Sequence, residues 1–170
     1  MRLTNAVTFL KLLLCPITHS SFLIRSVSRA ALSFGFCWGS PIWANVDYDF
    51  SNAGATGRLG PTQTQVNSAY SGSNLAGNVT INAQGIQEWT VPVTGEYRIE
   101  AKGAKGGGGT AAGLGAQIAG SFSLTQGSLL KIVVGQAGGL AGNNNTTSGG
   151  GGSFVIKSPY NSNSSILIIA

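Results

Sequence analysis

The sequence from Asn45 onward lacks both cysteine and histidine. The two cysteines of the chain, Cys15 and Cys37, and its one histidine, His19, all precede that point. The later part therefore cannot form a disulfide, a metal site built on thiolate or imidazole, or a catalytic triad that uses histidine. We expect it to hold no metal, no cofactor and no catalytic residue.

Charge is also scarce. Asp, Glu, Lys and Arg make up 9% of the 170 residues, against about 25% in ordinary soluble domains. The formal net charge is +5, but the part from Asn45 onward has six basic and five acidic residues and so carries only +1. Because the excess basic charge lies in the first 44 residues, the rest presents no footprint for a polyanion. We expect no nucleic-acid partner.

Carboxylates are the remaining candidates for acid–base chemistry, such as the paired acids of glycoside hydrolysis. Glu96 and Glu100 alternate with apolar residues along one predicted strand, which is typical of a solvated face. This explanation is preferred to an active site, and we do not expect an enzyme. The five acidic residues are Asp47, Asp49, Glu88, Glu96 and Glu100.

The first 44 residues have the pattern of an export signal. Arg25 and Arg29 precede an apolar run over residues 30–39, and the small residue Ala44 is followed by polar sequence. A basic segment, an apolar run and a small residue at the cleavage site define a secretory signal. We predict a leader over residues 1–44, cleavage after Ala44 and a secreted or cell-surface location.

Two alternatives to this leader stay open. An uncleaved anchor needs about 20 predominantly apolar residues, and residues 6–24 come close but are interrupted by Lys11, Pro16 and His19. Residues 1–22 are more than a signal requires, so a second hypothesis is that translation starts nearer Val27. We expect no membrane insertion of the domain that follows the leader.

Apolar alternation predicts an all-β fold for residues 45–170. Residues 96–102 and 88–93 alternate with period two and are joined by a turn at Thr94-Gly95. No helical apolar period of useful length occurs after residue 45, so a sandwich or barrel is expected. Further inward rows are predicted at Ile118/Phe122/Leu124, Leu130/Ile132/Val134 and Phe154/Ile156, and residues 166–169 are expected to form a strand covered on both faces.

Three glycine clusters separate these strands. Flexible loops of the linker type are one interpretation, and local composition favours it. The other is that the glycines extend as left-handed helices with three residues per turn, which stack because no side chain intervenes. A phosphate-binding loop is not expected, since none of the clusters opens a helix. The clusters are Gly103 with Gly106–Gly109, residues 135–139, and Gly149–Gly152.

From about Tyr48 onward the order and spacing of several motifs resemble a known family. These motifs are Gly60-Pro61-Thr62-Gln63, Gly85-Ile86-Gln87-Glu88-Trp89-Thr90-Val91-Pro92, Gly103-Ala104 and Val133-Val134-Gly135-Gln136. They are similar to the glycine-rich extracellular domain of the anaplastic lymphoma kinase and leukocyte tyrosine kinase receptors. The resemblance implies a jelly-roll β-sandwich similar to tumour necrosis factor, with insertions of polyglycine helix, that helps to bind protein ligands outside the cell.

The chain departs from this family in three respects. Ala53 and Val66 stand where the resemblance implies a cysteine pair, and we expect a small apolar contact in its place. No kinase signature follows the domain. The sequence stops at residues 165–170, an apolar segment typical of a core strand, and we expect the domain at 45–170 to be incomplete at this end.

Together these features predict a secreted or cell-surface recognition module without catalytic activity. Its expected partner is an extracellular protein or glycan. The alternative is a structural component of a surface coat or adhesin, in which stacked glycine segments serve as packing material. Trp89, Tyr70 and Tyr160 are the candidates for an aromatic binding patch, although each is more often a core residue.

Overall fold

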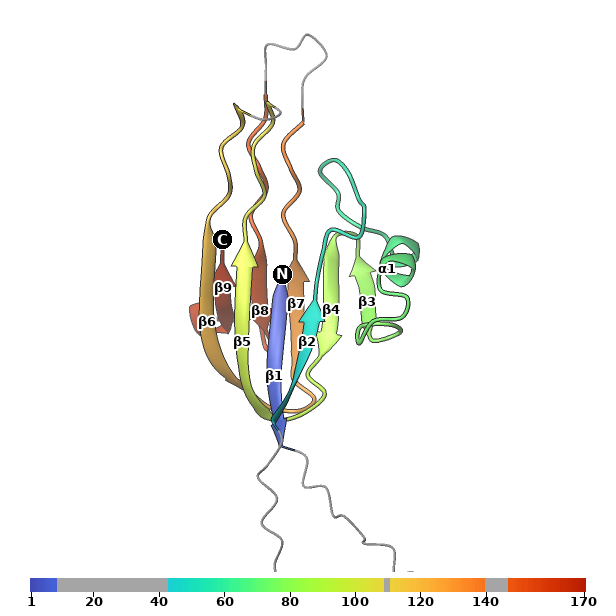
Figure 1. Ribbon diagram of the computed structural model, residues 1–170, viewed down its shortest axis with the longest axis vertical. Helices are drawn as coiled ribbons and strands as arrows, with labels where there is room; N and C mark the ends of the chain where they lie inside the picture. Colours follow the sequence, from blue (N-terminus) through green and yellow to red (C-terminus); the bar gives the residue numbers. More distant parts are fainter. Residues whose placement is uncertain (9–42, 109–110, 140–146) are drawn as a thin grey trace, which may run out of the picture.

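The chain folds as two antiparallel β-sheets packed face to face (Figure 1). The computed structural model describes residues 1–8, 43–108, 111–139 and 147–170. The all-β sandwich predicted from the sequence is confirmed. One sheet has the order β2-β1-β5-β6, with β1 (Arg2–Thr8), β2 (Trp43–Asp49), β5 (Gly95–Lys102) and β6 (Gln117–Leu124). The other has the order β3-β4-β7-β8-β9, with β3 (Val79–Ala83), β4 (Ile86–Thr90), β7 (Leu129–Val133), β8 (Phe154–Lys157) and β9 (Ile166–Ile169).

Aromatic side chains fill the centre of the core around Trp89. Its ring lies 4.8 Å from that of Tyr48, 5.9 Å from that of Phe50 and 6.2 Å from that of Tyr97, measured between centroids. Tilted and edge-on pairs at these separations add to the stabilisation from burial. Trp89 is only 2% exposed, so this cluster holds the two sheets together.

Alternation along β5 and β7 is as the sequence predicts. Tyr97, Ile99 and Ala101 are fully buried on β5, and Leu130 and Ile132 are fully buried on β7. The polar residues between them face outward because successive side chains of a strand point to opposite faces. These rows position the glycine segments that follow each strand.

The two predictions for the last strands are wrong in detail. On β8 the fully buried residue is Val155, and Phe154 and Ile156 are only half-buried. The register between β8 and β9 shifts at Val155/Ile156, and such a bulge re-aims the side chains beside it. β9 lies at the sheet edge, so Ile166 and Ile169 are 42% and 48% exposed rather than covered on both faces.

A short helix, α1 (Gln63–Ala69), was not expected from the sequence. Thr62 accepts a hydrogen bond from the backbone N–H of Gln65, and the Gln65 side chain accepts one from the Thr62 N–H. This is a capping box. Only Val66 and the following Tyr70 are buried, so the apolar pattern is too short to reveal a helical period. Ala53 and Val66 both belong to the core cluster.

Residues 2–8 form β1, although the sequence analysis assigns them to the leader. β1 lies between β2 and β5 and pairs antiparallel with both. Leu3 is fully buried in the core, and Arg2 forms ion pairs with Asp47 and Asp49. A single seven-residue strand gave no periodic signal that would separate it from the apolar sequence behind it.

The leader itself lies largely outside the described residues. This applies to its apolar run at residues 30–39, and cleavage after Ala44 stays a prediction. Ala44 is a residue of β2, so cleavage there would remove β1 and leave β2 and β5 without the strand between them.

The core also sets the titration of the tyrosines. Burial raises the pKa of Tyr97 to about 12, and burial raises the pKa of Tyr48, Tyr70 and Tyr160 as well. The unfolded chain titrates near pH 10, so the stability gained from keeping Tyr97 neutral is full below pH 10. It is lost as the pH rises toward 12.

We therefore expect phenolate absorbance of the folded chain to develop later than that of the chain in denaturant, with unfolding accelerated between about pH 10 and 12. Four tyrosines that titrate together near pH 10 in the folded chain would contradict this packing.

Candidate functional site

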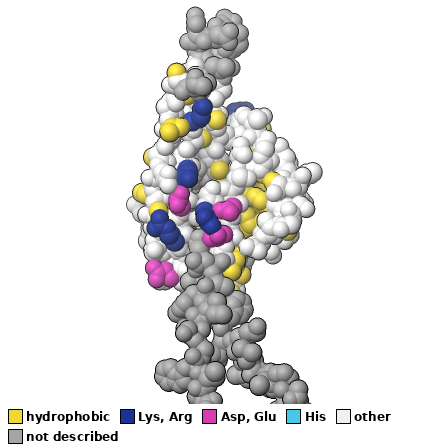
Figure 2. Space-filling model, viewed as in Figure 1, with side chains coloured by type: hydrophobic (Ala, Val, Ile, Leu, Met, Phe, Trp, Pro, Cys, Tyr) yellow, Lys and Arg dark blue, Asp and Glu magenta, His cyan; other side chains and the backbone are white. Residues whose placement is uncertain are grey.

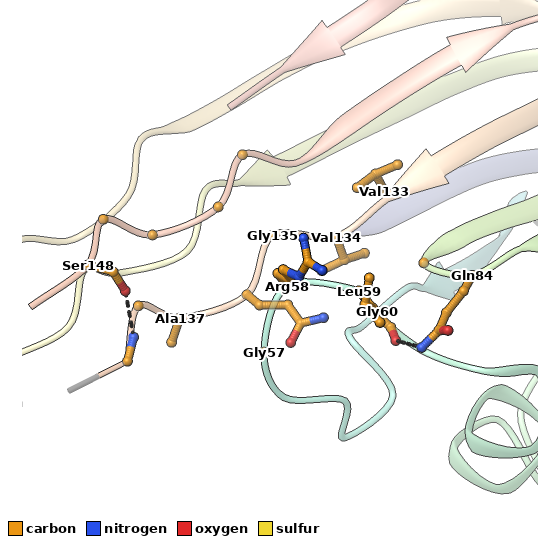
Figure 3. Close-up of a pocket in the computed structure, with 18 of the residues that line it drawn as sticks. Gly57, Arg58, Leu59, Gly60, Gln84, Val133, Val134, Gly135, Ala137 and Ser148 are labelled. Carbon is orange, nitrogen blue, oxygen red and sulfur yellow. Dashed lines mark hydrogen bonds between the residues drawn. The ribbon is translucent and has the colours of Figure 1, made fainter. Parts of the chain in front are cut away.

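A hollow of about 520 Å³ lies where the loop after β2 meets the glycine segments that follow β7 and precede β8. This volume is within the range of about 300–1,000 Å³ typical of ligand pockets. We call it the glycine pocket. Its lining comes from residues 57–60, 84–86, 133–139 and 148–152 (Figure 3).

The glycine segments that frame the pocket are bonded to one another. Four extended segments continue beyond the ends of β5, β6, β7 and β8 and run side by side (Figure 1). Backbone N–H groups of one segment donate to carbonyls of the next, as from Gly107 to Ser148, from Gly138 to Lys105 and from Gly151 to Gln136, at 2.8–3.0 Å. This arrangement favours packed glycines over flexible loops. Helices with three residues per turn stay a prediction.

Several of these glycines leave no room for a side chain. A Cβ atom added to Gly150 would lie 2.0 Å from the carbonyl oxygen of Ala104, and one added to Gly135 would lie 2.1 Å from that of Gly151. The adjacent Gly149 has open space around it. Close approach of backbones, rather than loop flexibility, therefore explains why glycine is needed at these positions.

A second contact between glycines fixes the opposite wall. Gly60 and Gly85 both have positive φ angles, +74° and +86°, and a Cβ atom on Gly85 would lie 2.4 Å from the Leu59 carbonyl oxygen. The Gly85 N–H donates to the Pro61 carbonyl at 3.0 Å, and the Gln84 amide donates to the Gly60 carbonyl at 3.2 Å. Through these contacts the turn between β3 and β4 fixes the position of residues 57–60, the loop that carries Arg58 and forms one wall of the pocket.

The pocket is lined by one cationic side chain, by side-chain amides and by an apolar surface. Figure 3 shows the Arg58 side chain close to Val134 and Gly135. Arg58 is exposed and forms no ion pair within the described part of the chain. The Oε1 atom of Gln136 is buried and has no hydrogen-bond partner. Ile86, Val133 and Val134 supply half-buried apolar surface.

The aromatic residues considered in the sequence analysis do not form a patch. Trp89 and Tyr70 are 2% and 4% exposed and belong to the core. The Tyr70 hydroxyl donates to the fully buried Gln87 amide oxygen at 2.5 Å, and that amide donates to the Ser51 carbonyl at 2.7 Å. Tyr160 is 37% exposed and lies under the Lys131 ammonium, 4.4 Å from its ring centroid.

Four of the five carboxylates, those of Asp47, Asp49, Glu88 and Glu100, are engaged with basic or amide groups. Glu88 lies 3.6 Å from Lys131 and accepts a hydrogen bond from Asn82 at 2.6 Å, and Glu100 lies 3.3 Å from Lys102. Figure 2 shows acidic and basic side chains interspersed over the four-stranded sheet. In the residues that the structure covers, no group of three or more His, Cys, Asp or Glu side chains could hold a metal ion.

Comparison with known proteins shows similarity to a receptor. In an alignment of 107 positions that covers 58% of this chain, the sequence is 41% identical to the leukocyte tyrosine kinase receptor of Mus musculus. Part of this chain is thus similar to part of that receptor. The chain spans only 12% of the length of the receptor, and no protein-family model matches. Among the described residues, no helix is long and apolar enough to cross a membrane.

The sequence analysis did not identify the residues of the pocket. Arg58 was counted only as a charge, and residues 135–139 were interpreted as a glycine cluster and a family motif but not as the wall of a pocket. The available signal was indirect. Gly57 and Gly60 lie on either side of Arg58, and both adopt the positive φ angles that glycine favours. An arginine between two turn glycines was therefore the signal in the sequence.

Proposed function

We propose that the chain is a secreted or cell-surface recognition module without catalytic activity, and that the matched region corresponds to a glycine-rich ectodomain. The similarity to a region of a receptor carries this proposal. The glycine pocket supports it, because a rigid hollow with an unpaired cation and an unpartnered acceptor is suited to binding rather than chemistry. The expected partner is an extracellular protein or glycan.

A structural role in a surface coat or adhesin is the second candidate. The bonded glycine segments favour it, since they could pack against copies of themselves as they pack within the chain. The two functions differ at Arg58. A recognition module needs this side chain, whereas a packing element built on glycine backbone does not.

Export is the first part to test. The full chain with a C-terminal epitope tag is expressed in a secretion-competent host, and the tagged product is recovered from the medium or the outer cell surface. N-terminal sequencing of this product tests the predicted cleavage after Ala44, which would remove β1, against export of a chain that keeps β1. Product that remains inside the cell with Met1 intact would exclude the export that we propose.

Recognition is the second part to test. The exported chain is applied to an array of extracellular proteins and glycans, together with the variants Arg58→Gln and Arg98→Gln. Arg98 is also an exposed arginine, on β5 and outside the pocket. We expect saturable binding that Arg58→Gln weakens and Arg98→Gln does not. Binding that is indifferent to Arg58 would favour the structural role.

A further inference from the structure

We propose that the glycine pocket binds the C-terminal end of a polypeptide, with Arg58 pairing with the terminal carboxylate. This inference rests on the proposed recognition function and names its ligand. It follows from three groups in one hollow: the Arg58 guanidinium, the Gln136 amide oxygen and the apolar surface between β4 and β7.

The first requirement of such a ligand is negative charge. No acidic residue lines the pocket, and Arg58 has no ion-pair partner among the described residues, although all five acidic side chains of the chain are among them. Arg2, Lys102 and Lys131 each lie beside a carboxylate. Arg98, Lys105 and Lys157 form no ion pair in the described part of the chain either, but only Arg58 lines the pocket. A guanidinium forms two parallel hydrogen bonds with a planar carboxylate, so an unpaired arginine at a pocket favours this group.

The second requirement is a hydrogen-bond donor. The Gln136 Oε1 atom is removed from water without gaining a partner, which destabilises the free protein. Because the Gln136 side chain lines the pocket, a rotation of its amide would turn this oxygen toward a ligand N–H and remove that penalty. Gln136 lies on the bonded glycine segment, where its own carbonyl accepts from the Gly151 N–H at 2.9 Å, so its backbone is fixed before any ligand arrives.

The third requirement is an apolar group. Ile86, Val133 and Val134 are half-buried, and Leu59 is 57% exposed at the rim of the pocket. Burying this surface would contribute to affinity. The last residue of a polypeptide carries all three groups around one Cα atom: a carboxylate, an amide N–H and a side chain.

An acidic sugar shares the carboxylate and the amide of this ligand. It would place hydroxyl groups against the apolar wall, where they find no partner. A peptide ending in an aliphatic residue therefore fits the pocket better, and the sugar becomes an outcome of the test.

The experiment uses the full chain and fluorescein-labelled tetrapeptides that end in leucine, one with a free carboxylate and one amidated. Fluorescence polarisation is expected to show saturable binding of the free acid, with the amidated peptide weaker by about tenfold or more. Arg58→Gln should produce a similar loss for the free acid. Arg98→Gln, the matched control, should leave its affinity unchanged.

A second variant separates binding from folding. Gln136→Met removes the unpartnered oxygen while keeping an unbranched side chain, so we expect weaker peptide binding together with an unchanged or raised melting temperature. A role for Gln136 in folding alone would instead lower the melting temperature and leave the affinity of the folded fraction intact.

The inference is overturned if neither peptide binds, if both bind equally, or if Arg58→Gln has no effect on the free acid. Saturable binding of N-acetylneuraminic acid in the absence of peptide binding would also overturn it, in favour of an acidic glycan. If the peptides fail but the array yields a ligand that depends on Arg58, only this inference falls. If the array also yields nothing, the proposed function falls with it.

Discussion

Trp89→Ala is expected to lower the free energy of unfolding by about 3–5 kcal/mol. Trp89, on β4 of the five-stranded sheet, is buried and contacts the rings of Tyr48 and Tyr97 on the opposite sheet and of Phe50 just after β2. Its removal leaves a cavity that these rings can fill only by moving away from their own partners. Because domains are stable by only about 5–15 kcal/mol, much of the native population should be lost.

Urea unfolding monitored by far-ultraviolet circular dichroism measures this loss without depending on the deleted fluorophore. Trp89→Phe should be intermediate, since a ring remains in the cluster. Leu114→Ala is the control, because Leu114 is 87% exposed and should change stability by less than about 0.5 kcal/mol. A Trp89→Ala chain as stable as this control would show that the core is arranged differently.

Gly150→Ala is expected to destabilise the chain by about 1–3 kcal/mol or more, as overpacking does. The added methyl group would lie 2.0 Å from the Ala104 carbonyl oxygen, and backbone cannot rotate aside as a flexible side chain could. The glycine segments would have to separate, and the pocket that they frame should widen.

The neighbouring residue provides the matched control. Gly149→Ala adds the same methyl group where nothing lies within 4 Å, so it should be neutral or slightly stabilising through the unfolded state. Thermal unfolding of the two variants should therefore diverge although they differ by one position. Equal melting temperatures would mean that the glycine segments are not packed as described.

Local sequence carried enough information for strands with a clear apolar alternation, but not for β1 or for what surrounds each strand. The alternation of Tyr97, Ile99 and Ala101 gave both β5 and its buried face correctly, because period two dictates which side chains share a face. The prediction that β9 is covered on both faces was wrong, because an apolar run does not reveal whether the strand lies at the edge of its sheet. The helix α1 was missed because only Val66 and Tyr70 are buried on it, and its capping box at Thr62 and Gln65 was the signal that remained.

The pocket could not be predicted because its parts are distant in the sequence. Arg58 and Gln136 are separated by nearly half of the chain and come together at the pocket, where Gly60 lies against both Gly85 and the Gln136 side chain. That Arg58 has no ion-pair partner among the described residues, and that the Gln136 Oε1 atom has no hydrogen-bond donor, can be seen only once the chain is folded. Composition can say that glycine is abundant, but only the backbone contacts show which glycines are required.

The proposed recognition site requires that the glycine segments lining the pocket are ordered by the hydrogen bonds between them. Amide hydrogen exchange on the full chain tests this most directly, at the Gly107, Gly138 and Gly151 N–H groups that donate to neighbouring segments. We predict that these amides exchange slowly and are protected together with the strands they extend. Exchange as fast as that of a flexible glycine linker would contradict this order, and with it the pocket and the function proposed for it.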